Sequence, residues 1–239
     1  MTGLSSLVLA AHGTRDPAGI AELDRLASLV SARLPGVSVH LGYVDVLGPS
    51  VAEVLASVDG PVTLVPLFLA SGYHVHSDIP AAVADAARDD VTVTPPLGPD
   101  PALIDVAVDR LRAAGSADPR VITDARPADA VVLAAAGSAD PRALADVRAA
   151  AQLLGAPAGF IATASPSVAD IVGSIRARRG GRVAIASWLL APGFFHSRLA
   201  HAGADIVAEP LGAHPLVADL VVHRATARPG SDRMAHLSK

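Results

Sequence analysis

The sequence has no cysteine among its 239 residues. This absence excludes disulfide bonds, thiolate metal sites, cysteine-ligated iron–sulfur clusters and a cysteine nucleophile. Aromatic residues make up only 3% of the chain while 51% is hydrophobic, so alanine, valine and leucine must form the core. Lysine is nearly missing too, since eighteen of the nineteen basic residues are arginine. The net charge of −4 argues against a nucleic-acid-binding surface.

Long hydrophobic runs are also missing. The longest apolar stretch, residues 183–195, contains Ser187, Pro192 and Gly193 and falls short of the roughly 20 residues that span a bilayer. The first six residues carry no basic cluster, and the apolar run after them is too short for the core of a signal peptide. We therefore expect a cytoplasmic protein with no membrane partner.

A short apolar run near the start of the chain leads directly to a histidine. Residues 7–11 are all apolar and end in turn-forming residues, which predicts a strand buried on both faces. His12 then lies at the carboxyl end of this strand, the edge where open α/β sheets bind ligands. Residues 18–34 repeat apolar side chains at the spacing of an amphipathic helix.

Predicted strands and helices alternate along the rest of the first half. Strands are expected at 37–46, 61–70 and 91–94, and helices at 51–58, 81–88 and 101–114. Such alternation is typical of a parallel sheet with helices on both faces. Ser50, followed by Glu53, matches the capping box of a helix start.

The second half of the sequence repeats the first. The motif VLAAHGTRDP at 8–17 returns as VLAAAGSADP at 132–141, and LASGYH at 69–74 returns as LAPGFF at 190–195. The order of the repeated motifs predicts an α/β protein of two tandem domains with a cleft between them. We expect an N-terminal domain with the active site at residues 1–114 and a linker at 115–129. A degenerate C-terminal repeat is expected at 130–225, followed by a disordered tail at 226–239.

The two copies act as an internal control on function. Glycines and prolines of the turns persist in both copies, whereas three polar residues are lost together: His12, Asp45 and His74 become Ala136, Ala162 and Phe195. All three lie at predicted carboxyl ends of strands. Two imidazoles and one carboxylate suit a divalent first-row metal with coordination positions left open, which indicates catalysis or transfer.

Neighbouring polar residues have simpler interpretations. Asp78 is expected to cap the helix that begins near Pro80. Asp16 persists in the second copy as Asp140, which indicates a turn or cap. His76 would point away from His74 if the backbone between them is extended.

The motifs HGTRDP at 12–17 and GYHVHSDIP at 72–80 together resemble the sirohydrochlorin chelatases, the class II chelatases of siroheme and cobalamin synthesis. The resemblance covers nearly the whole chain. It implies ATP-independent insertion of Fe²⁺ or Co²⁺, itself a substrate, into sirohydrochlorin, with no organic cofactor. His12 and His74 match the two metal-binding histidines, while Asp45 stands where the family more often has glutamate.

The resemblance also implies how the substrates are held. His12 and His74 would hold the metal on one face of the ring and one of them would take a pyrrole proton, while Asp45 orients an imidazole or completes the ligand set. Arg15, Tyr73 and His76 are the residues expected to bind the macrocycle, whose eight carboxylates favour cationic and N–H donors. The protein would be a monomer or a homodimer.

Other functions remain open at this point. A non-catalytic carrier of a tetrapyrrole or a divalent metal would need the same cleft. The His-Gly-Thr motif is shared with phosphoglycerate mutase-like phosphatases, but these place an arginine where Ala11 stands. The sequence has no Walker loop and no Gly-x-Gly-x-x-Gly motif, which argues against nucleotide-driven and dinucleotide-dependent enzymes.

Overall fold

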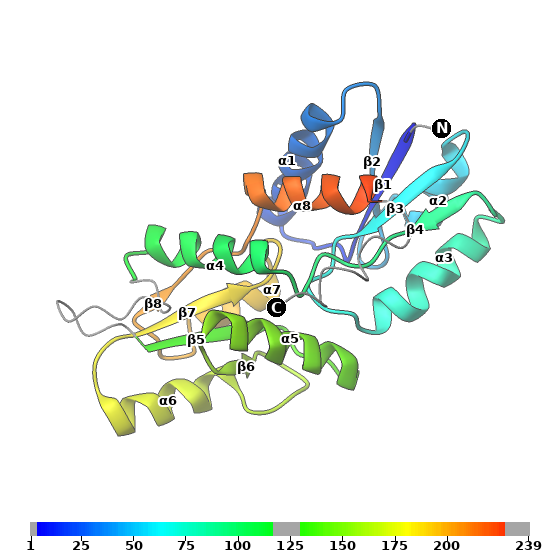
Figure 1. Ribbon diagram of the computed structural model, residues 1–239. Helices are drawn as coiled ribbons and strands as arrows, with labels where there is room; N and C mark the ends of the chain where they lie inside the picture. Colours follow the sequence, from blue (N-terminus) through cyan, green and yellow to red (C-terminus); the bar gives the residue numbers. More distant parts are fainter. Residues whose placement is uncertain (1–3, 117–129, 228–239) are drawn as a thin grey trace, which may run out of the picture.

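The computed structural model describes residues 4–116 and 130–227 and contains two four-stranded sheets (Figure 1). Both sheets are entirely parallel and share one strand order, β2-β1-β3-β4 in the first half and β6-β5-β7-β8 in the second. The strands are β1 (Ser6–Ala11), β2 (Ser38–Tyr43), β3 (Val62–Pro66), β4 (Val91–Val93), β5 (Ala130–Ala135), β6 (Ala158–Phe160), β7 (Val183–Trp188) and β8 (Ile206–Val207). The prediction of two tandem α/β units is confirmed.

Helices connect the strands and cover both faces of each sheet. They are α1 (Pro17–Arg33), α2 (Val51–Ser57), the π-helical turn η1 (His74–Asp78), α3 (Ile79–Asp85), α4 (Pro101–Ala113), α5 (Pro141–Leu154), α6 (Val168–Arg179), α7 (Phe194–Leu199) and α8 (Pro215–Thr226). Asp16 and Asp140 cap α1 and α5 as expected, and Ser50 and Glu53 form the predicted capping box. Across the described residues, no helix combines the length and apolarity needed to cross a membrane.

The strand that leads to His12 is buried on both faces, as its sequence indicates. Leu7 and Leu9 point into a central core, whereas Val8 and Ala10 join a separate core beneath α2 and α3. The second sheet has a matching outer core beneath α6 and α7. The central core continues from one sheet to the other, so the two halves share one hydrophobic interior.

The last helix of each half packs on the sheet of the other half (Figure 1). α4 contacts α5 and β7, while α8 contacts α1 and β3. Ion pairs support the exchange, with Arg33 Nε 2.6 Å from Asp219 Oδ1 and Arg224 Nη2 2.9 Å from Asp100 Oδ2. The two sequence repeats are therefore interlocked in space. Residues 117–129 of the expected linker and 228–239 of the expected tail lie outside the described residues.

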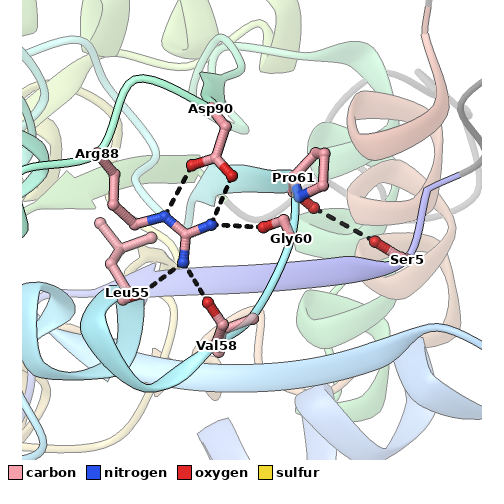
Figure 2. A network of polar contacts seen from close by, with 7 residues as sticks. All are labelled: Ser5, Leu55, Val58, Gly60, Pro61, Arg88 and Asp90. Carbon is pink, nitrogen blue, oxygen red and sulfur yellow. Dashed lines mark hydrogen bonds and ion pairs between the residues drawn. The ribbon is translucent and has the colours of Figure 1, made fainter.

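Arg88 ties the end of α2 to the turn before β3 (Figure 2). Its guanidinium donates to the carbonyl oxygens of Leu55, Val58 and Gly60 and pairs with Asp90 at 2.8 Å. The carbonyls at the end of a short helix, which have no partner within the helix, are thereby satisfied. The turn before β3 is therefore held in place at the amino end of that strand, opposite the carboxyl end that leads to the candidate site.

Candidate functional site

His12 follows β1 directly and enters a turn. Gly13 has a φ of +96°, and a Cβ atom there would collide with the backbone oxygen of Asp45, so this position requires glycine. The His12 carbonyl accepts a hydrogen bond from the Asp45 backbone N–H at 3.2 Å. The turn therefore brings the loop after β2 against the loop after β1, at the carboxyl edge of the sheet.

His74 is the first residue of η1, which follows the loop after β3. Its Nδ1 lies 2.5 Å from Oδ2 of Asp78, one turn further along. The expectation that Asp78 caps a helix is wrong, because its backbone is already helical and its side chain makes no capping hydrogen bond. The π-helical turn runs directly into α3, so no free helix end remains at Asp78. Because this segment is helical, the four-residue spacing of His74 and Asp78 places their side chains on one face.

The two predicted histidines meet in space. Their ring centroids are 4.6 Å apart with the rings tilted by 38°, and both rings line a cavity of about 810 Å³ between the two halves. Nδ1 of His12 is buried and has no hydrogen-bond partner. Burial lowers the pKa of His12 below 6.5, and the neighbouring His74 lowers it further, while Asp45 and Asp78 act in the opposite direction. The site thus favours a neutral His12, the form that binds metal.

Asp45 lies beside this pair but does not line the cavity. It is exposed, and its Oδ1 accepts a hydrogen bond from the Val46 N–H at 2.7 Å. Within residues 4–116 and 130–227, no three histidine, aspartate or glutamate side chains are grouped so that they could hold a metal ion. The chain therefore presents two imidazoles together, with Asp45, the carboxylate of the predicted trio, outside the cavity lining.

The residues predicted to bind substrate divide into two groups. Arg15 and Tyr73 both line the cavity from exposed positions, and the Tyr73 ring lies edge-on to His74 at 6.1 Å. His76 is exposed outside the cavity lining, with Nε2 2.8 Å from Ser71 Oγ. The backbone between His74 and His76 is π-helical rather than extended, because the loop after β3 turns directly into a helix.

The second half supplies the opposite wall of the cavity. Ala136 and Phe195, the counterparts of the two histidines, both line it. Five of the seven aromatic residues in the chain gather here, namely Phe68, Tyr73, Trp188, Phe194 and Phe195. Sequence reasoning missed Trp188, whose Nε1 is buried without a partner, and the exposed Phe194. In a chain with so few aromatics, their position at or just after the end of a repeated strand was the available signal.

Each cavity loop is held by the opposite half. The Ser71 N–H donates to Asp146 Oδ2 on α5 at 2.7 Å. In the other direction, Gly19 on α1 approaches the loop after β7 so closely that a Cβ atom would collide with the Pro192 carbonyl oxygen. The loops that carry His74 and Phe195 are thus fixed by contacts across the cavity.

Comparisons with known proteins agree with this architecture. The model of the CbiX family matches residues 6–114 and 130–228. A sirohydrochlorin cobaltochelatase from Methanococcoides burtonii is 30% identical over 115 residues, covering 41% of this chain and 88% of the relative. The chloroplastic sirohydrochlorin ferrochelatase of Arabidopsis thaliana is 29% identical over 114 residues, covering 44% of this chain and 51% of the relative.

Solved structures share the fold. SirB from Bacillus subtilis with Fe³⁺ superposes with a TM-score of 0.75 at 18% identity, covering 93% of this chain and 94% of SirB. CbiX, described as the terminal enzyme of siroheme biosynthesis in denitrifying bacteria, gives a TM-score of 0.68 at 22% identity, covering 93% of this chain and all of CbiX. The resemblance to the sirohydrochlorin chelatases is confirmed, and the chain belongs to the CbiX family.

Proposed function

We propose that this protein inserts a divalent first-row metal ion, Fe²⁺ or Co²⁺, into sirohydrochlorin. The observation that carries the proposal is the approach of the His12 and His74 rings to 4.6 Å on one wall of a cavity of about 810 Å³. Curated relatives named as sirohydrochlorin cobaltochelatase and ferrochelatase support it. The aromatic lining supports it as well, because a conjugated macrocycle has flat apolar faces that pack against aromatic rings.

The chemistry requires two exchanges at the ring centre. The metal ion binds to pyrrole nitrogens, and the two pyrrole N–H protons leave. In the proposed mechanism, the neutral imidazoles of His12 and His74 hold the metal on one face of the macrocycle and leave its other positions open to the pyrrole nitrogens. One imidazole, once it has released the metal, accepts the first of the two departing protons and passes it to water, and the second proton leaves to water directly.

Other residues of the cavity have supporting roles in this proposal. The Arg15 guanidinium binds a carboxylate at the edge of the macrocycle, and Tyr73 contacts the ring face near His74. Asp45, exposed beside the pair, favours the approach of a cation through its charge. The apolar wall of Phe195 and Trp188 holds the opposite face without competing for the metal.

A metallation assay tests the proposal. Purified protein at a tenth of the substrate concentration is mixed with sirohydrochlorin and Co²⁺ or Fe²⁺, and the visible spectrum is followed against a protein-free control. We expect several turnovers per protein, loss of the acceleration in His12→Ala and His74→Ala, and wild-type rates in His201→Ala, which alters an exposed histidine outside the cavity. Binding of sirohydrochlorin without acceleration would instead establish a carrier. Initial rates with the two metals decide the metal preference.

A further inference from the structure

We propose that Asp78 is a positioning residue that fixes which nitrogen of His74 faces the cavity. The inference rests on the proposed function, because it assigns the metal-binding atom of His74. It starts from the 2.5 Å distance between Nδ1 of His74 and Oδ2 of Asp78. His74 lines the cavity and Asp78 does not, so the carboxylate can act on a bound metal only through the imidazole.

The hydrogen bond determines the tautomer of His74. An ionised carboxylate only accepts hydrogen bonds, and a neutral imidazole carries one N–H. The proton of His74 is therefore held on Nδ1, toward Asp78, and the lone pair is left on Nε2. A partner of this kind also restricts rotation of the ring. Asp78 thus prepares Nε2 of His74 to bind a metal.

Comparison of the two sequence repeats supports a positioning role for Asp78. By the alignment that pairs His74 with Phe195, the counterpart of Asp78 is Leu199, which is buried in the outer core of the second half. α7 forms there without an aspartate, and Asp78 makes no capping hydrogen bond to α3. A helix start therefore does not explain the residue. The histidine and its carboxylate partner are lost together in the copy that lacks the metal-binding pair.

The first test reads the tautomer directly in metal-free protein. Protein labelled with ¹⁵N in its histidine rings is studied by NMR at pH 8, where ordinary histidines are neutral. We expect His74 to carry its proton on Nδ1 in the wild type and in Asp85→Asn. The latter removes the same charge from an exposed position on the same helix segment. In Asp78→Ala we expect a mixture of both tautomers. A wild-type His74 protonated on Nε2 overturns the inference without any variant.

The second test measures binding of Co²⁺ alone by its visible absorption. We expect Asp78→Ala to bind Co²⁺ about 10- to 100-fold more weakly than the wild type, Asp78→Glu to recover part of the loss, and Asp85→Asn to bind normally. Circular dichroism confirms that each variant is folded. Unchanged Co²⁺ affinity in folded Asp78→Ala overturns the inference. A wild type that holds His74 in the expected tautomer but never metallates sirohydrochlorin refutes the proposed function and leaves the assignment of Asp78 intact.

Discussion

The exchange of α8 between the two halves makes a quantitative prediction. Val221 belongs to the second half of the sequence, but it lies on α8, which packs against α1 and β3 of the first half. Its side chain is fully buried in the central core. Val221→Ala removes two buried carbon atoms at about 0.8 kcal/mol each. The cavity left behind raises the loss of unfolding free energy to about 2 kcal/mol.

Hydrogen exchange measured by mass spectrometry shows where this energy is lost. A loss of about 2 kcal/mol corresponds to roughly 30-fold faster exchange, and we expect it in β1 and β3, more than 150 residues away in sequence. The melting temperature should fall by about 4–8 °C, given about 2–4 °C per kcal/mol for a chain of this size. Leu153→Ala, which alters a side chain on α5 that is 50% exposed, is the control; it should change stability by at most about 0.5 kcal/mol.

Packing of each last helix on its own sheet predicts a different pattern of hydrogen exchange. If each repeat packed its own last helix, Val221→Ala would speed exchange in β5 and β7 and leave β1 and β3 protected. That pattern in a folded variant would refute the exchange of helices. A matching loss in both sheets would show only that the two halves unfold together through their shared core.

Three further predictions concern the site and its supports. The pKa of His12 lies below 6.5 in the folded state, so the unfolded chain binds more protons just below that pH. The wild type should therefore lose more unfolding free energy than His12→Ala on going from pH 7.5 to 5.5. Parallel losses in urea titrations of the two proteins would contradict this. Gly19→Ala, which would ordinarily stabilise a helix by up to about 1 kcal/mol, should instead destabilise by about 1–3 kcal/mol because the new Cβ meets the backbone of the opposite half; a raised melting temperature would exclude that contact. Arg224→Ala removes the partly buried ion pair with Asp100 and should lower the unfolding free energy by about 1.5–3 kcal/mol. The control Arg25→Ala alters a side chain that is 70% exposed and should lower it by at most about 1 kcal/mol. Equal losses in the two variants would contradict the role of the pair.

Local sequence patterns predict much of the architecture. The buried run before His12, the helical spacing after it and the repeated turn residues depend on neighbours close in sequence, so the strands, helices and two sheets could be predicted. The convergence of His12 and His74 followed from one rule of parallel sheets, in which the carboxyl ends of adjacent strands meet at one edge. This rule does not set how far a side chain reaches from the edge, so it did not predict the exposed position of Asp45.

Two features depend on information that local patterns lack. An apolar stripe shows that α4 and α8 need a buried face, but not which of two similar sheets supplies it. Repeats that resemble one another are ambiguous in this respect, and packing across the halves decides the result. The contact of His74 with Asp78 was hidden for a different reason. An aspartate two residues before a proline matches a helix start, and only the π-helical turn that ends at Asp78 shows that the helix has already begun.

The interlocked packing explains how one copy can lose its polar site and still be retained. The second half holds the loop of His74 through Asp146 and supplies the apolar wall that faces the histidines. Its last helix, α8, packs against α1 and β3 of the first half. A flat macrocycle needs metal ligands on one face only, whereas a second pair of imidazoles on the other face would compete for the same ion. The symmetric fold therefore requires both copies, while the proposed chemistry requires that one wall carry the histidines and the other carry aromatic and aliphatic side chains.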